Sequence, residues 1–109
     1  MIRVMLCVLI VGIVWPETAR AQDAKAGAKV FAEQNCSVCH SIGGKGNAKG
    51  ALDGVAGKLS PDEIRQWIVA PKEMTEKTKA IRQPVMKKFD LRKRDVDSLV
   101  AYLQTLTKH

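Results

Sequence analysis

Two cysteines and a histidine stand close together in the segment Cys36-Ser37-Val38-Cys39-His40, which is a C-x-x-C-H pattern. Two thiols separated by two residues match the spacing of the two vinyl groups of haem, to which they add as thioethers. The histidine that follows is then held beneath the iron and supplies an axial nitrogen. The pattern therefore predicts one covalently bound haem c, attached at Cys36 and Cys39, with His40 as the proximal iron ligand.

Three other interpretations of this pattern compete with haem. A disulfide between Cys36 and Cys39 would close a short, strained loop that adds little stability. A thioredoxin-like redox pair needs a βαβ context, and the sequence shows none. A zinc site would draw three ligands from one pentapeptide and has no evident fourth ligand. Haem is the interpretation that the motif favours together with the predicted export and the long loops described below.

The second axial ligand of such an iron is sought among the remaining histidine and methionines. His109 is the last residue, where fraying is expected, so ligation by two histidines is disfavoured. Two of the four methionines fall in the N-terminal segment, which leaves Met74 and Met86. Met86 follows Pro84 in a stretch between two predicted helices, which favours an extended, accessible side chain. Spacing and turn chemistry thus favour Met86, with Met74 as the alternative.

The N-terminal residues 1–21 have the pattern of a secretory signal peptide. Arg3 supplies the positive charge, and Val4 to Trp15 is an apolar run shorter than the roughly 20 residues of a membrane span. Ala19-Arg20-Ala21 is a suitable cleavage site, so we expect cleavage before Gln22; an uncleaved anchor is the alternative. Export by this route leads to the bacterial periplasm, an oxidising compartment.

The predicted mature chain, residues 22–109, is the length of one small domain. A domain of this size buries only about 60% of the surface that its unfolded chain exposes, and it usually needs reinforcement. Aromatic residues are 5% of the chain, too few for a conventional core. These values exclude a multidomain enzyme, a polytopic membrane protein and a disulfide-dense scaffold, and they suit a domain whose core is completed by a cofactor.

The net charge of the whole chain is +7, and removal of the signal segment, with two basic and one acidic residue, leaves +6. A basic protein in the periplasm is not expected to meet nucleic acid. Acidic protein partners, or a membrane surface, are the plausible targets of this charge.

Helical patterns flank a glycine-rich stretch. Asp23 to Gln34 is predicted as a helix with Asp23 as its N-cap, and Gly27 in its interior suggests that another backbone approaches closely there. Residues 41–59 hold six of the eight glycines and no strand alternation, which predicts a long loop without a sheet. Ser60-Pro61-Asp62-Glu63 is a capping box that starts a second helix.

The C-terminal part is expected to contain a polar stretch and the clearest helix. Pro71 ends the second helix, and residues 72–88 show little periodicity beyond one or two turns near Met74. Arg92 stands at the start of the last helix, where acidic residues are normally favoured. That helix has a single apolar stripe, formed by Val96, Leu99, Val100, Leu103 and Leu106. Trp67 of the second helix is expected to pack as a core aromatic, with contact to a haem propionate as the alternative.

Over nearly all of residues 22–109 the sequence resembles the class I c-type cytochromes, of the small bacterial monohaem kind. The resemblance rests on the following residues: Gly27 and Phe31, Cys36 to His40, Leu52-Asp53-Gly54-Val55, Lys58-Leu59-Ser60 with Ile64 and Trp67, Pro84-x-Met86-x-x-Phe89, and Leu99 to Leu103. It implies an all-α cytochrome c fold, with three to four short helices and long loops wrapped around the covalently bound haem.

The same resemblance implies roles for individual residues. The methionine of the P-x-M segment is the distal ligand in that family, which corresponds to Met86 here. The first and last helices of the family cross at a glycine–aromatic contact, which would pair Gly27 and Phe31 with Leu99 and Tyr102.

The sequence departs from the family pattern at three positions. Ala51 stands where the family commonly has a proline whose carbonyl accepts a hydrogen bond from the axial histidine. Lys87 replaces the proline that often follows the ligand methionine, which would make the iron–sulfur bond more labile. Arg92 replaces the serine or threonine that caps the last helix in many relatives.

These features predict a periplasmic carrier of single electrons, not an enzyme, because His40 and Met86 together leave no open coordination site. A haem protein that binds small gases after loss of the methionine is one alternative, and a haem subunit of a larger oxidoreductase is another. We expect a monomer that meets membranes only through partner complexes. Acidic oxidases, reductases or dehydrogenases would dock on a basic face near the haem edge, formed by Lys45, Lys49, Lys87, Lys88, Arg92, Lys93 and Arg94.

Overall fold

Helices make up most of the chain that the computed structural model describes, which is residue 12 and residues 16–107. In chain order the elements are α1 (Pro16–Glu33), η1 (Cys36–Val38), β1 (Ser41–Ile42), β2 (Lys45–Gly46), η2 (Ala48–Gly50), α2 (Val55–Lys58), α3 (Pro61–Val69), α4 (Pro71–Thr78) and α5 (Lys93–Leu103). The predictions for His109 and for most of the N-terminal apolar run lie outside the described residues. Within the described part, no helix combines the length and apolar character that crossing a membrane requires.

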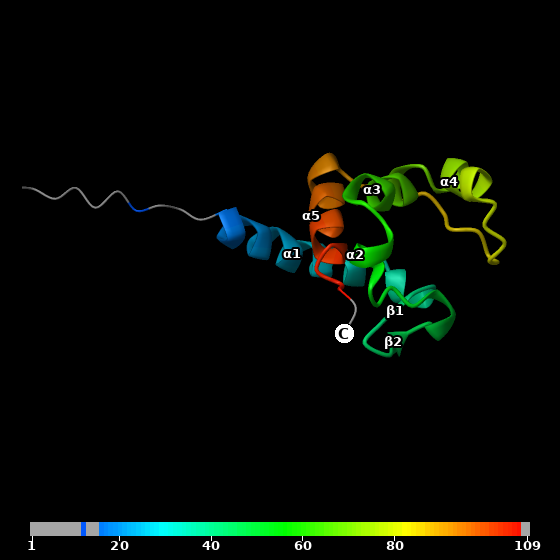
Figure 1. Ribbon diagram of the computed structural model, residues 1–109, viewed down its shortest axis with the longest axis horizontal. Coiled ribbons are helices and arrows are strands. Elements are labelled where there is room, and N and C mark those ends of the chain that lie inside the picture. Colours follow the sequence, from blue (N-terminus) through cyan, green and yellow to red (C-terminus); the bar gives the residue numbers. More distant parts are fainter. Residues whose placement is uncertain (1–11, 13–15, 108–109) are drawn as a thin grey trace, which may run out of the picture.

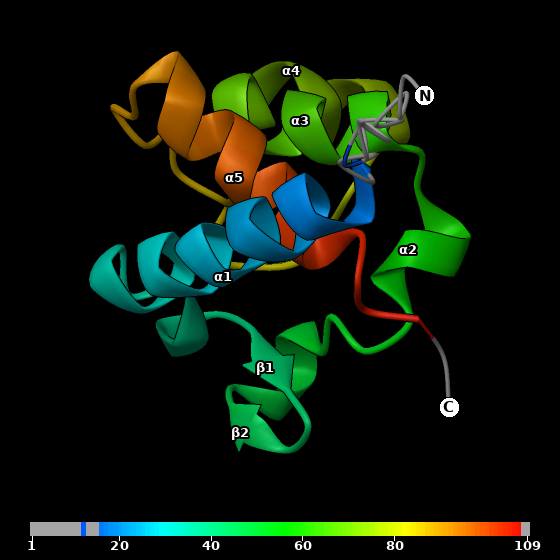
Figure 2. The ribbon, with the colours of Figure 1, turned by 90° about the vertical axis from the view of Figure 1, so that its left-hand side faces the viewer.

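The helices α1 and α5 cross at the centre of the molecule (Figure 1). Figure 2 shows α3 and α4 on one side of this pair and the short strands β1 and β2 on the other. The two strands form an antiparallel pair in which Ser41 lies opposite Gly46 and Ile42 opposite Lys45. The predicted all-α architecture is confirmed, and in the described residues the sheet that the sequence did not predict is limited to this pair.

The crossing of α1 and α5 depends on a glycine. Gly27 is buried, and a Cβ atom built on it would overlap the backbone carbonyl of Ser98 and the Cβ of Tyr102. Beside it, the rings of Phe31 and Tyr102 meet edge to face, with centroids 5.9 Å apart and planes at 63°. The contact that the sequence predicted between the first and last helices is therefore present, and its closest approach is at Ser98.

One hydrophobic core joins α1, α2, α3 and α5. Its buried members are Val30, Val55, Ile64, Ile68, Val96, Leu99, Val100 and Leu103. The apolar stripe predicted for the last helix supplies four of them. Leu106 lies beyond the end of α5 and is partly buried against the same core, and its carbonyl accepts a hydrogen bond of 3.1 Å from the Ala56 amide.

The start of the first helix was predicted wrongly. α1 begins at Pro16, not after Asp23, so it passes through the predicted cleavage point before Gln22. Proline is favoured at the first helical position, because its missing N–H has no partner to lose there. The sequence Glu17 to Ala21 that follows contains good helix formers, so the helix continues without needing a cap at Asp23. Its other end agrees with expectation, since Asn35 adopts a left-handed conformation with φ 56°.

The glycine-rich stretch 41–59 is more structured than a long loop. Gly43 and Gly44 have φ of 58° and 79°, and this allows the tight turn between β1 and β2. Two single-turn helices, η2 and α2, follow within the same stretch. Such elements are too short for a periodic pattern, which is why the sequence did not reveal them.

The α3 helix begins as predicted. The Ser60 hydroxyl accepts a hydrogen bond from the Glu63 amide at 3.1 Å, and the Glu63 carboxylate accepts one from the Ser60 amide at 3.0 Å. α3 ends before Pro71, which then occupies the first turn of α4. The eight residues of α4 agree with the one or two helical turns expected near Met74, and Met74 itself is buried.

Replacement of Ser60 with alanine tests the contribution of this cap. We expect the free energy of unfolding at pH 7 to fall by about 1 kcal/mol, because one amide of the first turn of α3 loses its partner. Urea unfolding followed by circular dichroism measures the change. Thr107→Ala serves as the control, since Thr107 is exposed beyond α5 and its side chain forms no hydrogen bond in the described part of the chain. An equal midpoint for both variants would contradict the role of the cap.

The same cap makes part of the stability dependent on pH. The hydrogen bonds from Ser60 lower the pKa of the Glu63 carboxyl in the folded protein. A carboxyl with a lowered folded pKa stabilises the fold above its unfolded pKa of about 4.3, and that contribution disappears as the pH falls through the folded value. The main donor is the Ser60 amide, which Ser60→Ala would keep, so the variant that tests this is Glu63→Gln. The difference in stability between wild type and Glu63→Gln should be smaller at pH 3 than at pH 7. A constant difference would contradict this assignment.

Candidate functional site

The C-x-x-C-H segment directly follows α1 and folds as a single tight turn. After the left-handed residue Asn35, the amides of Cys39 and His40 both donate to the Cys36 carbonyl, at 3.2 and 2.9 Å. The Val38 amide donates to the Asn35 carbonyl at 3.0 Å. The sequence-predicted residues Cys36, Cys39 and His40 are thus held together by backbone hydrogen bonds of this turn.

The two cysteines are half-buried free thiols. Burial raises the pKa of the Cys36 thiol, a backbone hydrogen bond opposes the rise, and the neighbouring Cys39 adds to it. Cys36 is therefore a neutral thiol at pH 7, and the disulfide considered from the sequence is not formed. Among the described residues, no group of three or more histidine, cysteine and acidic side chains is arranged to hold a metal ion.

The imidazole of His40 is oriented by a backbone carbonyl. Its Nδ1 lies 2.9 Å from the carbonyl oxygen of Gly50, and because a carbonyl only accepts, Nδ1 carries the proton. The other nitrogen, Nε2, then keeps a lone pair that can bind a metal. Burial lowers the pKa of His40, the hydrogen bond to Gly50 partly opposes this, and the charge of Arg82 lowers it further. The ring is therefore neutral at neutral pH, as an iron ligand must be.

The acceptor of this hydrogen bond was assigned wrongly from the sequence. Ala51 was expected to provide the carbonyl, but the structure uses Gly50, one residue earlier. Ala51 instead forms a β-bridge with Ser41, whose carbonyl accepts the Leu52 amide at 2.8 Å. This bridge fixes the backbone so that the Gly50 carbonyl meets the ring of His40.

Asn47 and Gly46 pack the loop onto the C-x-x-C-H turn. The Asn47 amide lies 3.1 Å from the carbonyls of both Ser37 and His40, and its side chain donates to Val38 at 3.2 Å. A Cβ on Gly46 would overlap the carbonyl oxygen of His40. The sequence analysis did not identify Asn47; its place among glycines was the available signal, since asparagine side chains often bind backbone in turns.

The two candidate methionines differ in their surroundings. Met74 is 5% exposed and lies within the packing of α4. Met86 is half-buried in the segment between α4 and α5, where it lines a cavity of about 490 Å³. The other lining residues are Val69, Ala70, Pro71, Lys72, Glu73, Val85, Lys87 and Lys88. Met86 thus lines an open cavity while Met74 is buried, and Cys36, Cys39 and His40 are not among the residues that line this cavity.

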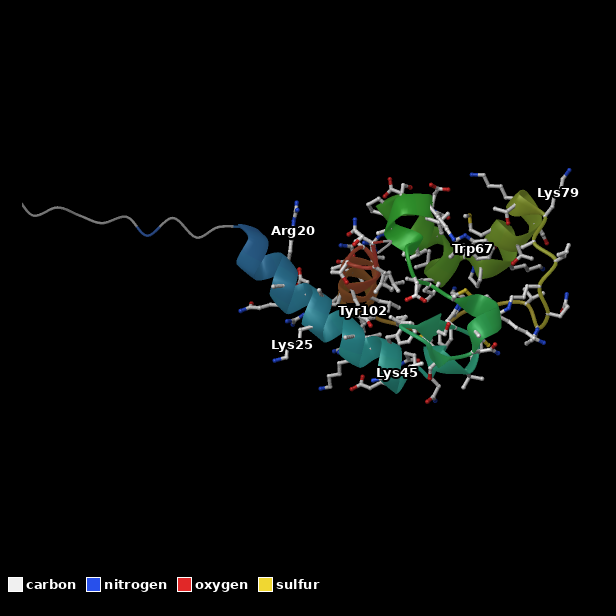
Figure 3. All side chains as sticks on the ribbon, turned by 60° about the horizontal axis from the view of Figure 1, so that its bottom comes forward. Arg20, Lys25, Lys45, Trp67, Lys79 and Tyr102 are labelled. Carbon is white, nitrogen blue, oxygen red and sulfur yellow. The ribbon has the colours of Figure 1, made fainter. Side chains whose placement is uncertain are left out.

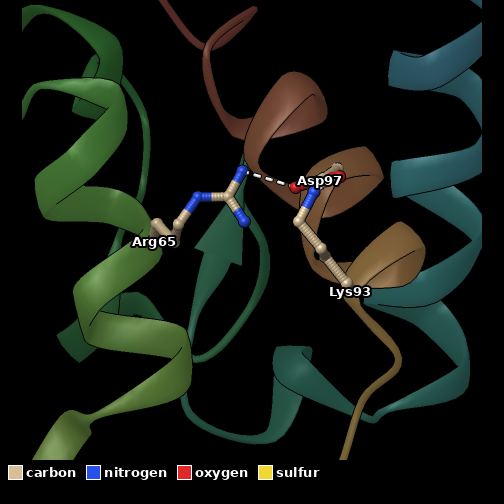
Figure 4. A network of polar contacts seen from close by, with 3 residues as sticks. All are labelled: Arg65, Lys93 and Asp97. Carbon is tan, nitrogen blue, oxygen red and sulfur yellow. Dashed lines mark hydrogen bonds and ion pairs between the residues drawn. The ribbon is translucent and has the colours of Figure 1, made fainter.

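Part of the predicted basic face is paired with carboxylates. Arg92 lies 3.1 Å from Asp95, and Lys93 lies 3.5 Å from Asp97. Asp97 also binds Arg65 of α3 at 2.6 Å, which links α3 to α5 (Figure 4). The hydrogen bond from Arg65 is the main reason why the pKa of Asp97 is lowered. These pairs offset two of the three basic residues at the N-terminal end of α5, Arg92 and Lys93, where the helix dipole opposes positive charge.

The remaining cations of that face are exposed. They are Lys45, Lys49, Lys87, Lys88 and Arg94. Lys45 lies on β2, and Figure 3 shows Lys79, a further exposed lysine, at the end of the molecule far from α1. The positive charge is therefore spread over a broad surface. Trp67, also labelled in Figure 3, is half-buried on α3 and is not part of the core cluster, contrary to the expectation of a core aromatic.

The arrangement fits a covalently attached haem. Two unpaired thiols and a neutral imidazole with a free Nε2 are presented by one turn, and this is the donor set that thioether attachment and iron ligation require. A half-buried methionine, Met86, lies on a separate segment. An all-α fold with this site defines a c-type haem protein.

Comparison with known proteins agrees with this class. The profile of the cytochrome c family matches residues 24–107, so the chain belongs to the cytochrome c family. Membership in this family implies covalently bound haem c and haem-based electron transfer.

One curated relative is similar to this chain at lower identity. It is 29% identical over 92 residues to the cytochrome c oxidase subunit 2 of Alkalihalophilus pseudofirmus, in a match that covers 76% of this chain. The chain spans only about a quarter of that relative, 25% of its length. No solved structure matches significantly.

Proposed function

We propose that the protein is a periplasmic monohaem electron carrier whose haem is attached at Cys36 and Cys39 and whose iron is ligated by His40 and Met86. The observation that carries the proposal is the hydrogen bond from His40 Nδ1 to the Gly50 carbonyl, which leaves Nε2 free beside two unpaired thiols. When bound, the haem supplies a one-electron couple between ferric and ferrous iron.

Residues of the chain orient the proximal ligand, set the reduction potential and occupy both axial positions of the iron. The Gly50 carbonyl fixes the tautomer and orientation of His40, as outer partners of metal-binding histidines generally do. The Met86 thioether favours ferrous iron and so raises the potential relative to a second histidine. With both axial positions held by protein, no site remains for a substrate, which supports a carrier over an enzyme.

The proposed partners are acidic redox proteins that meet the exposed cations. Lys87 and Lys88 directly follow the proposed ligand Met86, and both are exposed. Arg94 is exposed in the first turns of α5 and adds to the same excess of positive charge. Such a charge distribution speeds association with an acidic partner at low ionic strength. Location in the periplasm is supported by the signal pattern of residues 1–21.

A second candidate function is that of an electron-transfer domain within an oxidase complex. The similarity to an oxidase subunit 2 favours it, although the match covers only a quarter of that relative. Size-exclusion chromatography of the holoprotein with a solubilised oxidase distinguishes the two functions. A free monomer that exchanges electrons with the oxidase supports the carrier, and permanent co-elution supports the subunit.

Mass spectrometry of the exported protein tests the proposed function directly. We expect the intact mass to exceed that of the polypeptide by one haem, and the double variant Cys36→Ala, Cys39→Ala to show the bare polypeptide mass. The reduced wild-type protein should not change its optical spectrum promptly when carbon monoxide is added at neutral pH. A bare mass for wild type would overturn the proposal, and a prompt spectral change would replace the carrier with a gas-binding protein.

A further inference from the structure

Arg82 connects the segment that carries Met86 to the C-x-x-C-H turn. Its Nη2 donates to the Cys39 carbonyl at 2.6 Å, across 43 positions of sequence. In the described part of the chain, the other hydrogen bond of residues 81–90, from the Leu91 amide to the Phe89 carbonyl, is local. The segment is also poorly packed, since Ile81 is 90% exposed. The position of this segment therefore depends strongly on Arg82.

The guanidinium of Arg82 lies directly against Gly50. A Cβ on Gly50 would overlap the Arg82 guanidinium and the Cys39 carbonyl, so only glycine leaves room for the arginine there. The carbonyl of the same Gly50 accepts the hydrogen bond from His40. Arg82 and His40 thus both contact Gly50. A movement of the Arg82 side chain would therefore displace Gly50 and, with it, the hydrogen bond that orients His40.

The charge of Arg82 acts at this site without a carboxylate to neutralise it. Among the described residues, Arg82 forms no ion pair, and its side chain is half-buried. The guanidinium lies against Gly50, whose carbonyl is 2.9 Å from His40 Nδ1, so its charge lies close to the imidazole ring. A fixed positive charge disfavours ferric iron more than ferrous iron, because the ferric centre carries one more positive charge.

We infer that Arg82 is a positioning residue that holds the Met86 segment against the Cys39–Gly50 region and raises the reduction potential through its charge. This inference rests on the proposed function, because it concerns the same His40 and Met86. It assigns a role to a residue that lies outside both the C-x-x-C-H motif and the P-x-M segment.

The variant Arg82→Met tests the inference, because methionine has similar length but lacks the charge and the hydrogen bonds. We expect the equilibrium for reduction to shift about tenfold toward the ferric form, which is a fall of about 59 mV for one electron. We also expect faster amide hydrogen exchange in residues 81–90 of the holoprotein. The matched control is Arg94→Met, which removes an exposed arginine of α5 that forms no ion pair in the described residues.

A second variant, Arg82→Lys, separates charge from geometry and is available if Arg82→Met does not mature. Lysine keeps the charge but lacks the planar fork of the guanidinium. The equilibrium constant for reduction should stay within about threefold of the wild-type value. Amide hydrogen exchange in residues 81–90 should still be faster than in wild type.

Three outcomes are informative. The two expected changes, both larger than in Arg94→Met, support the inference. If the potential and the exchange rate of both Arg82 variants match those of Arg94→Met, the inference about Arg82 is wrong and the proposed function remains intact. A wild-type protein without a reversible one-electron couple overturns the proposed function itself, and the role of Arg82 with it.

Discussion

Replacing Met86 with alanine is expected to remove the sulfur-to-iron charge-transfer band and to lower the reduction potential strongly. A thioether stabilises ferrous iron, so its loss shifts the equilibrium toward the ferric form. We expect about a hundredfold change in the equilibrium constant, which corresponds to about 120 mV for one electron. The variant should also bind carbon monoxide promptly when reduced, because an axial position has become free. An optically followed redox titration measures the first two effects.

The matched control for this experiment is Met74→Leu. Met74 is 5% exposed, and a swap of methionine for leucine in a packed site conserves volume and costs less than about 1.5 kcal/mol. The spectrum and potential of Met74→Leu should therefore equal those of wild type. If the charge-transfer band survives in Met86→Ala and disappears in Met74→Leu, the distal ligand is Met74 and the assignment made here is wrong.

The elements that sequence analysis predicted well are those encoded locally. The capping box at Ser60 and the stop at Pro71 fix α3 within a dozen residues, and both are present as expected. The stripe from Val96 to Leu103 likewise predicts α5, because helical periodicity is visible over three turns. The C-x-x-C-H motif is local too, and one turn holds its three chemically active side chains together.

The parts that sequence analysis missed are contacts between distant segments. The hydrogen bond from Arg82 to the Cys39 carbonyl joins residues 43 positions apart, and no pattern in either segment specifies the pairing. The acceptor for His40 shifted from Ala51 to Gly50 because a β-bridge to Ser41 sets the backbone there. Such choices depend on the assembled fold.

The early start of α1 has a different cause. A cap at Asp23 and a proline at Pro16 are both legitimate helix starts, and the choice between them depends on what precedes the helix. The prediction of a mature chain beginning at Gln22 favoured Asp23, whereas in the full chain the helix extends back to Pro16. The helix boundary and the processing of the chain are therefore linked questions.

Replacing Gly27 with alanine is expected to lower the free energy of unfolding strongly. The added Cβ would overlap the Ser98 carbonyl, which is backbone and cannot rotate away, so α1 and α5 must separate. Separation also disrupts the edge-to-face contact of Phe31 with Tyr102. Forcing an extra carbon into such a contact costs about 3 kcal/mol. Chemical unfolding of the oxidised holoprotein, followed by circular dichroism, measures this loss.

The control for Gly27→Ala is a second glycine that lies in a helix but is not in contact with another element. Gly57 in α2 is exposed, and nothing lies within 4 Å of a Cβ built on it. Gly57→Ala should leave the protein equally stable or stabilise it by about 0.5 kcal/mol, because alanine restricts the unfolded chain. The contrast between these two identical substitutions isolates the contact with Ser98 from the helix propensity of alanine. Equal unfolding midpoints for the two variants would show that the helices do not approach each other as closely at Gly27 as the structure indicates.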